Sequence, residues 1–154
     1  MPDADLVYLP GGYPELFVYR LSRQKKLMAQ IKDYAENGGK ILAECGGMMY
    51  LTRSLTTKQG KTYLMTGVLP LDCTMKNAKL HLGYRQFEYN GLNLKGHEFH
   101  YSEIVSPNLP DSLVQQYNAA GIRVDTPLYR YKNVIAGYTH LYWGETNILK
   151  LWEW

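Results

Sequence analysis

The hydrophobic pattern of the first fifty residues is that of a β-α-β unit. A short apolar run at 5–9 is followed by a segment, 22–37, whose apolar side chains recur at helical spacing. Those apolar positions are Leu27, Ile31, Tyr34 and Ala35. Ser22 is a suitable N-cap, Gly38-Gly39 ends the helix, and 40–43 forms a second apolar strand. Two strands joined by one helix predict a parallel pair.

The rest of the chain predicts strands and hairpins. Extended segments are expected over 63–70, 79–89, 94–105, 122–131 and 134–138. Turn signals lie at Asn90-Gly91 and Lys95-Gly96, and 147–154 predicts a short helix. The apolar face of that helix consists of Ile148, Leu151 and Trp152. No repeat or linker interrupts the pattern, so residues 1–154 are expected to form one domain.

Cys45 lies between the strand 40–43 and the pair Gly46-Gly47, after which a helix-compatible segment begins. This order predicts a thiol on a sharp strand-to-helix turn, the cysteine counterpart of the G-x-S-x-G nucleophile elbow with Ala43 in place of the first glycine. A helix N-terminus beyond the sulfur favours the reactive thiolate. The alternative is a buried structural cysteine. Since Pro10-Gly11-Gly12 ends the first strand, both turns should meet at one sheet edge.

A base is expected near Cys45, because an ordinary thiol is mostly protonated at neutral pH. His140 follows the apolar stretch 134–139 and should emerge at the same sheet edge, which makes it the favoured base. His100 is the alternative. His81 is expected to be a surface or hydrogen-bonded core residue.

The run His97-Glu98-Phe99-His100 differs from the metal-binding H-E-x-x-H motif, because its histidines are three positions apart. On a strand such positions point to opposite faces, and a third ligand at suitable spacing is absent. The sequence therefore predicts no metal site. His97, Glu98, His100 and Tyr101 are expected to contact the substrate or a partner domain, with ordinary strand packing as the alternative.

Composition narrows the setting. The net charge of +3 is mild and its lysines and arginines are scattered, which predicts no nucleic-acid partner. No apolar run approaches the ~18 residues of a membrane span, so no membrane association is expected. The 2 cysteines, Cys45 and Cys73, have neither metal-ligand spacing nor a disulfide framework. A reducing, cytoplasmic setting is predicted.

Several motifs together carry a specific resemblance. They are Leu9–Glu15 (LPGGYPE), Ala43–Leu51 (AECGGMMYL), Leu82–Arg85 (LGYR), Gly96–Ser102 (GHEFHYS) and Gly137–His140 (GYTH). In this order they resemble the carboxy-terminal glutaminase domain of the cobyrinic acid a,c-diamide synthases, a type shared with cobyric acid synthases. The resemblance extends from about Asp5 to Trp152.

The resemblance implies an α/β fold, the flavodoxin-like class I glutamine amidotransferase domain. Its central, mostly parallel sheet would carry helices on both faces and added antiparallel hairpins. Cys45 would attack the side-chain amide of glutamine and form a glutamyl thioester, with His140 as general base. Backbone N–H groups of Gly46 and of the Gly11-Gly12 turn would stabilise the oxyanion.

One position departs from the wider superfamily. Many of its glutaminases place a glutamate two residues after the histidine, where this chain has Tyr142. The cobyrinate-type relatives are likewise understood to use a Cys–His pair. Glu145 is a candidate for orienting His140, with a surface carboxylate as the alternative.

The resemblance further implies that the released ammonia amidates the a and c carboxylates of a corrinoid in vitamin B12 biosynthesis. ATP and Mg would act in a separate synthetase domain, whose P-loop motif this chain lacks, and the glutaminase domain itself would need no cofactor. The chain is expected to lack the domain's first βα segment, which exposes an apolar edge near the first strand and favours self-association. The alternatives are an unrelated Cys–His hydrolase on a flavodoxin-like scaffold and an inactive docking fragment.

Overall fold

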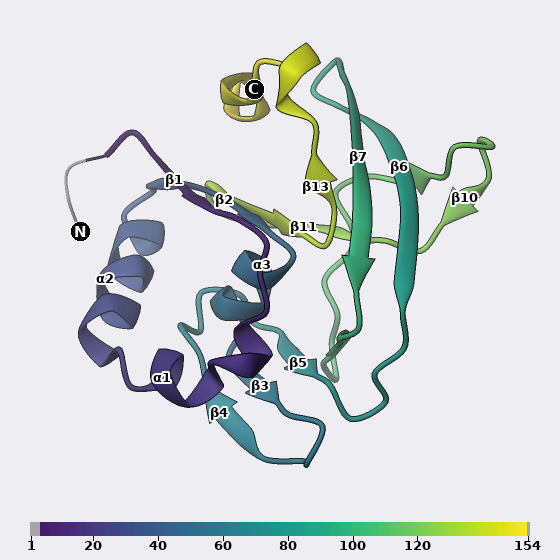
Figure 1. Ribbon diagram of the computed structural model, residues 1–154. Helices are drawn as coiled ribbons and strands as arrows, with labels where there is room; N and C mark the ends of the chain where they lie inside the picture. The colour runs from purple at the N-terminus through teal and green to yellow at the C-terminus, as the bar shows by residue number, and fades with distance from the viewer. Residues whose placement is uncertain (1–3, 154) are drawn as a thin grey trace.

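The computed structural model describes residues 4–153, apart from the side chain of Glu145. A four-stranded sheet crosses the middle of the molecule in the order β1-β2-β12-β11 (Figure 1). Its strands are β1 (Leu6–Leu9), β2 (Lys40–Glu44), β12 (Val134–Gly137) and β11 (Leu128–Tyr131). Both β1 and β12 run parallel to β2, whereas β11 is antiparallel to β12. The predicted parallel β-α-β unit is confirmed.

Two further sheets flank this one. The first has the order β10-β9-β6-β7-β13, with strands Arg123–Val124, Gln116–Tyr117, His81–Tyr89, Leu92–His100 and His140–Leu141. The second has the order β4-β3-β5-β8, with strands Thr62–Leu64, Ser54–Thr56, Asp72–Thr74 and Glu103–Val105. The long β6–β7 hairpin turns at Asn90-Gly91, where both residues have positive φ, as the sequence predicts.

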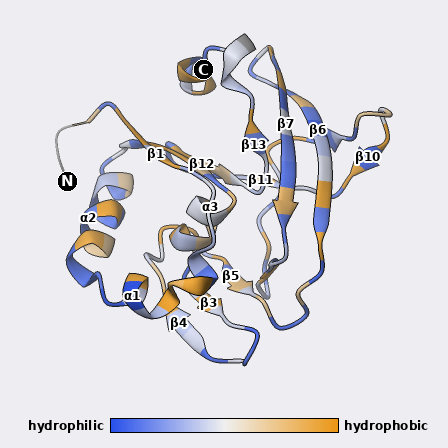
Figure 2. Ribbon diagram, in the orientation of Figure 1, coloured by the Kyte–Doolittle hydropathy of each residue, from blue (hydrophilic) through white to orange (hydrophobic). Residues whose placement is uncertain are grey.

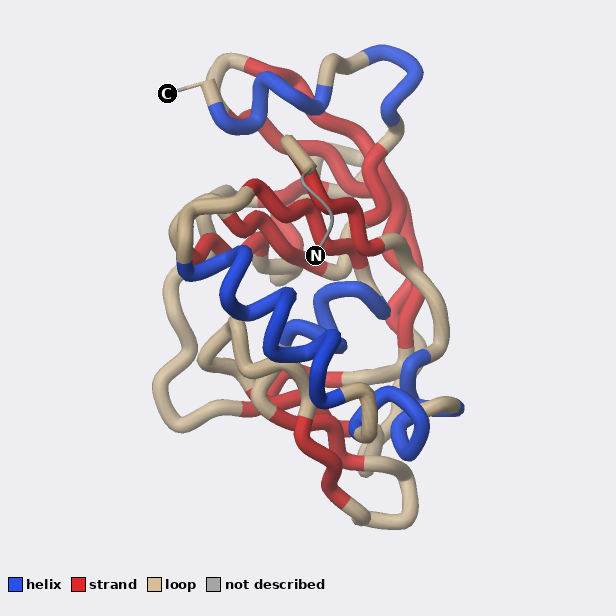
Figure 3. The backbone as a smooth tube through the Cα atoms, turned by 90° about the vertical axis from the view of Figure 1, so that its left-hand side faces the viewer, coloured by secondary structure: helices blue, strands red, loops and turns tan. Residues whose placement is uncertain are grey.

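The helices lie mainly between the central sheet and the small β4-β3-β5-β8 sheet (Figures 1 and 3). The α-helices are α1 (Val18–Ser22), α2 (Lys25–Glu36) and α3 (Gly46–Leu51). Short 3-10 helices are η1 (Pro14–Leu16), η2 (Trp143–Glu145) and η3 (Ile148–Trp152). Among the described residues, no helix has the length and apolar character that a membrane crossing needs.

Strand β2 separates two apolar cores because its side chains alternate between the faces of the sheet. Ile41 and Ala43 pack into a core shared with α2, α3 and the small sheet. Leu42 packs on the other face with Phe87 of the hairpin and Trp152 of η3. Helices thus cover both faces unequally, and the hairpin sheet takes most of the second face. Figure 2 shows the matching alternation of apolar and polar residues along α2.

The first predicted helix differs in detail from the structure. Ser22 ends α1 rather than capping a longer helix, and Gln24 precedes α2. The residues before 22 already form helical turns, so the chain reverses at 23–24 instead. The buried face of α2 consists of Met28, Ile31 and Ala35, whereas Leu27 is 43% exposed. The predicted periodicity was therefore one residue out of phase at its start.

The predicted turn at Lys95-Gly96 is wrong, because both residues lie inside β7. The glycine is required by close packing: a Cβ at Gly96 would clash with the backbone carbonyl of His140 on the neighbouring strand. Of the extended segment 63–70, only Thr62–Leu64 forms a strand. The closing helix is of the 3-10 type and buries the three predicted apolar residues, while position 154 lies outside the described residues.

Gly47→Ala tests the close packing that fixes the Cys45 turn. A Cβ at this position would clash with the backbone carbonyl of Leu9, which cannot move without shifting β1. We expect the free energy of unfolding to fall by at least ~1–3 kcal/mol, the usual cost of overpacking. Chemical denaturation measures it. The matched control is Gly144→Ala, whose Cβ would meet no heavy atom within 4 Å; equal stability of the two variants would contradict the prediction.

Candidate active site

Cys45 occupies a strained turn between β2 and α3. Its φ of 48° and ψ of −107° are unusual for a residue with a side chain. The turn is held on both sides: the Cys45 N–H donates to the Gly137 carbonyl at 2.7 Å, and the Cys45 carbonyl accepts from the Met49 N–H at 3.0 Å. The predicted strand–cysteine–helix elbow is confirmed as a backbone geometry.

Two glycine-rich turns meet at this elbow. A Cβ on Gly46 would lie 2.5 Å from the carbonyl oxygen of Gly12, so the two backbones are in direct contact. The backbone N–H groups of Gly46 and Gly12 hydrogen-bond to the Cys45 sulfur and lower the pKa of its thiol. The structure thus brings two N–H donors to the position that the sequence predicts.

Burial nevertheless dominates the environment of the thiol. Cys45 is 5% exposed, and burial raises its pKa to about 11, with a smaller raising contribution from the Glu15 carboxylate. The sulfur lies 3.7 Å from the backbone carbonyl oxygen of Phe99, to which the thiol donates. Cys45 is therefore a protonated thiol at neutral pH.

His140 lies at the same edge of the sheet, as predicted. It belongs to β13, which pairs with β7 so that His140 is opposite His97. The two imidazole rings stack with centroids 4.8 Å apart. A Cβ on Gly11 would overlap the His140 ring, which places this ring one residue from the Gly12 N–H that reaches the sulfur. Burial, followed by repulsion from His97 and His100, lowers the pKa of His140.

A residue that sequence reasoning missed, Glu44, holds β13 in place. Its carboxylate is 3% exposed, accepts the Tyr8 hydroxyl at 2.7 Å and accepts the backbone N–H of Leu141 at 3.1 Å. Because Leu141 follows His140 directly, Glu44 ties the base's strand to the strand that carries Cys45. The available signal was an acidic residue at the end of an otherwise apolar strand. Tyr142 contacts the His97 ring, and the Glu145 side chain lies outside the described part of the chain.

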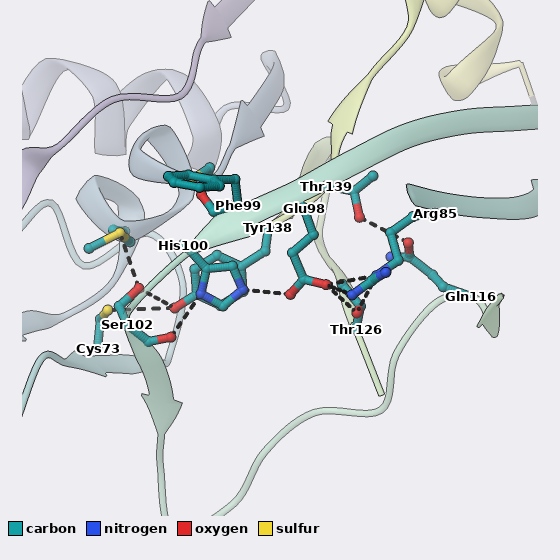
Figure 4. A network of polar contacts seen from close by, with 12 residues as sticks. Cys73, Arg85, Glu98, Phe99, His100, Ser102, Gln116, Thr126, Tyr138 and Thr139 are labelled. Atoms are coloured by element: carbon teal, nitrogen blue, oxygen red, sulfur yellow. Dashed lines mark hydrogen bonds and ion pairs between the residues drawn. The ribbon is translucent and has the colours of Figure 1, made fainter. Parts of the chain in front are cut away.

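His100, the alternative base, lines the cavity beside Cys45 but has no free ring nitrogen. Its Nδ1 lies 2.9 Å from the Ser102 carbonyl oxygen and its Nε2 lies 2.5 Å from Glu98 Oε1. Glu98 also pairs with Arg85, and Figure 4 shows the resulting chain of contacts running into the interior. Since both nitrogens already face acceptors, His100 cannot take a thiol proton while these contacts hold.

The four residues expected to contact substrate or a partner domain have separate surroundings. His97 packs on His140, whereas Glu98 and His100 are 3% and 7% exposed and pair internally. An interdomain contact through Glu98 or His100 is therefore incorrect for this structure, because their polar atoms are already engaged. Tyr101 is 37% exposed and lines the cavity beside Cys45.

The space beside the sulfur is small and opens into a wider pocket. The inner cavity of about 10 Å³ has room for about one water molecule. An outer pocket of about 330 Å³ shares part of its lining with the inner one and adds Lys58. The shared residues are Tyr13, Glu15, Met75 and Tyr101. A substrate would reach Cys45 through this outer pocket.

Comparison with known proteins identifies relatives along most of the chain. Residues 1–148 match the family model of the CobB/CobQ-like glutamine amidotransferase domain. A hydrogenobyrinate a,c-diamide synthase from Brucella abortus is 39% identical over 144 residues, which are 90% of this chain and 33% of the relative. A cobyrinate a,c-diamide synthase from Fusobacterium nucleatum is 37% identical over 149 residues, 92% of this chain and 33% of the relative. The chain thus spans about a third of the length of these relatives.

Solved structures support the fold. A crystal structure of a glutamine amidotransferase superposes with a TM-score of 0.57 at 18% identity, covering 88% of this chain and 70% of the other. A putative GMP synthase component from Thermoplasma acidophilum gives 0.51 at 17% identity, with 90% and 64% covered. The α/β architecture predicted from the motifs is confirmed by these neighbours. On the family match over nearly its whole length, the chain belongs to the CobB/CobQ-like glutamine amidotransferase domains.

Proposed function

We propose that Cys45 and His140 hydrolyse the side-chain amide of glutamine and release ammonia. The observation that carries this proposal is the meeting of three groups at one sheet edge: a strained cysteine turn, two backbone N–H donors and a histidine beside them. Nucleophile, oxyanion donors and base are the parts that amide cleavage by a cysteine requires.

The protonation states set the order of the chemistry. The thiol has a pKa of about 11 and His140 a lowered pKa, so both are uncharged at neutral pH. His140 takes the thiol proton as the sulfur attacks the amide carbon, and the carbonyl oxygen becomes an oxyanion. The N–H groups of Gly12 and Gly46 stabilise that oxyanion, each donor contributing typically ~2.7–4 kcal/mol.

The tetrahedral intermediate then collapses by breaking its C–N bond. The imidazolium of His140 returns the proton to the leaving nitrogen, so ammonia departs and a glutamyl thioester of Cys45 remains. His140, neutral again, takes a proton from water as the water attacks the thioester, which releases glutamate and the thiol. No cofactor takes part in these steps.

The outer pocket suits the charged end of glutamine. Glu15 and Lys58 both line it and carry opposite charges, matching the ammonium and carboxylate of a free amino acid. Glu15 also lines the inner cavity beside Cys45, so an amino acid held there would direct its side chain toward the sulfur. This arrangement favours free glutamine over a peptide as substrate.

The destination of the ammonia follows from the relatives. They are named hydrogenobyrinate and cobyrinate a,c-diamide synthases and are about three times longer than this chain. We infer that the chain supplies ammonia to an ATP- and Mg-dependent amidation of the a and c carboxylates of a corrinoid, carried out by a synthetase domain. Two free cysteines agree with a reducing, cytoplasmic setting.

Labelling with 6-diazo-5-oxo-norleucine, an electrophilic glutamine analogue, tests the nucleophile. We expect a covalent adduct on Cys45 that excess glutamine suppresses, because the analogue occupies the same pocket. Intact-mass and peptide mass spectrometry locate the adduct. Cys45→Ala should abolish labelling, while the matched control Cys73→Ser should keep it.

Two outcomes would point elsewhere. Absence of an adduct in a folded sample would favour an inactive docking fragment. Hydrolysis of peptides or esters without any effect of glutamine would favour an unrelated Cys–His hydrolase.

His97→Phe tests the electrostatics of the base. The pKa of His140 lies below its ordinary 6.5 because of burial and then repulsion from His97 and His100. Activity should therefore persist below pH 6.5 and fall as the pH drops through this lowered pKa. Replacing His97 by phenylalanine keeps an aromatic ring beside His140 but removes the second charge, so the acid limb should shift to higher pH.

The pH profile of kcat/KM for glutamine hydrolysis measures this shift. Tyr142→Phe is the matched control, since it alters a ring beside His97 without removing a charge from beside His140. An acid limb that moves to lower pH in His97→Phe would refute the assignment of that limb to His140.

A further inference from the structure

Three potential metal ligands gather on one face of the β6–β7 hairpin. His81 is directly opposite His100 in the register, and Glu98 lies two residues before His100 on the same strand face. One ligand atom from each residue lies within 4.8 Å of the others. The rings of His81 and His100 stack almost in parallel, with centroids 4.8 Å apart.

The hydrogen bonds of His100 prepare its Nε2 for a cation. Nδ1 faces the Ser102 carbonyl oxygen, which only accepts, so Nδ1 carries a proton. Nε2 faces Glu98 Oε1 at 2.5 Å, which requires one proton between these two acceptor-type atoms. An imidazole whose far nitrogen donates to a carbonyl is the usual arrangement around a metal-binding histidine.

The carboxylate of Glu98 is anchored in a complementary way. Its Oε2 accepts from Thr126 Oγ1 at 2.8 Å and from Arg85 Nε at 2.7 Å. Oε1 is left for His100 and for a cation beside it. Outer contacts of this kind fix the direction of a ligating carboxylate.

His81 supplies the unsatisfied group. Its Nε2 is buried and has no hydrogen-bond partner among the described residues. A buried polar atom without a partner is costly, and a bound cation would compensate a nitrogen of this kind.

A route for an ion is present. An open cavity of about 290 Å³ is lined by His81, Glu98 and His100 together with Glu103 and Asp125. The two additional carboxylates attract a cation to the entrance and offset the positive charge of Arg85, which lies on the Oε2 side of Glu98.

We propose that His81, Glu98 and His100 form a binding site for a divalent cation of the zinc class, which replaces the proton shared by His100 and Glu98. Two imidazole nitrogens and one carboxylate oxygen are a donor set of zinc sites, with the fourth position left to water. Because the ligands must converge and the shared proton must leave, binding releases about one proton.

The site is separate from the proposed glutaminase pair. His97 and His140 stack on the opposite face of β7, since positions 97 and 98 of a strand point to opposite sides. Metal binding can therefore be measured without reference to glutamine hydrolysis.

Zinc titration of the chain by calorimetry in two buffers of different ionisation enthalpy tests the proposal. We expect one site and release of about one proton. Cobalt(II) should give visible d–d bands of a nitrogen and oxygen environment without the thiolate-to-metal charge-transfer band that ligation by Cys45 or Cys73 would produce.

His81→Ala and His81→Gln should weaken zinc binding by more than the ~10–100-fold that loss of an outer contact costs. The matched control His97→Ala removes a histidine from the other face and should leave the affinity within about twofold of the unaltered chain. Circular dichroism verifies folding of each variant. No zinc binding by the folded, unaltered chain, equal affinity after either His81 substitution, or a thiolate band with cobalt would each overturn the proposal.

Discussion

The site depends on one backbone contact, the approach of the turn after β1 to the turn after β2. Gly46 and Gly47 lie so close to the backbone of Leu9 and Gly12 that neither tolerates a Cβ without movement of a strand. This contact delivers the N–H groups of Gly12 and Gly46 to the Cys45 sulfur and holds Gly11 against the His140 ring. Because both turns follow parallel neighbouring strands, the sheet itself fixes their meeting point.

The base depends on a different layer of the fold. His140 is held by strand pairing with β7, by the absence of a side chain at Gly96 and by the Glu44 carboxylate on the next backbone N–H. Nucleophile and base therefore belong to different sheets, and Glu44 is the side chain that connects them. A small loss of packing in the hairpin would separate His140 from Cys45 without altering the cysteine turn.

Local sequence patterns predicted the features whose causes are local. The β-α-β unit, the Cys45 turn and the Asn90-Gly91 hairpin follow from periodicity and glycine placement within short windows. Features that arise between strands were not predictable in this way. Gly96 looked like a turn residue, although it makes room for the carbonyl of His140, and His81 looked isolated although it faces His100 across the hairpin.

The buried environment of Cys45 has a consequence for selectivity. A thiol with a pKa near 11 in a cavity of about 10 Å³ is a poor nucleophile toward small electrophiles, because both ionisation and access are restricted. A substrate that fills the outer pocket brings its carbonyl to the two N–H donors, so the negative charge that burial disfavours on sulfur is transferred at once to an oxygen with prepared partners. Burial therefore suppresses the idle thiolate and leaves stabilisation of charge to the moment of attack.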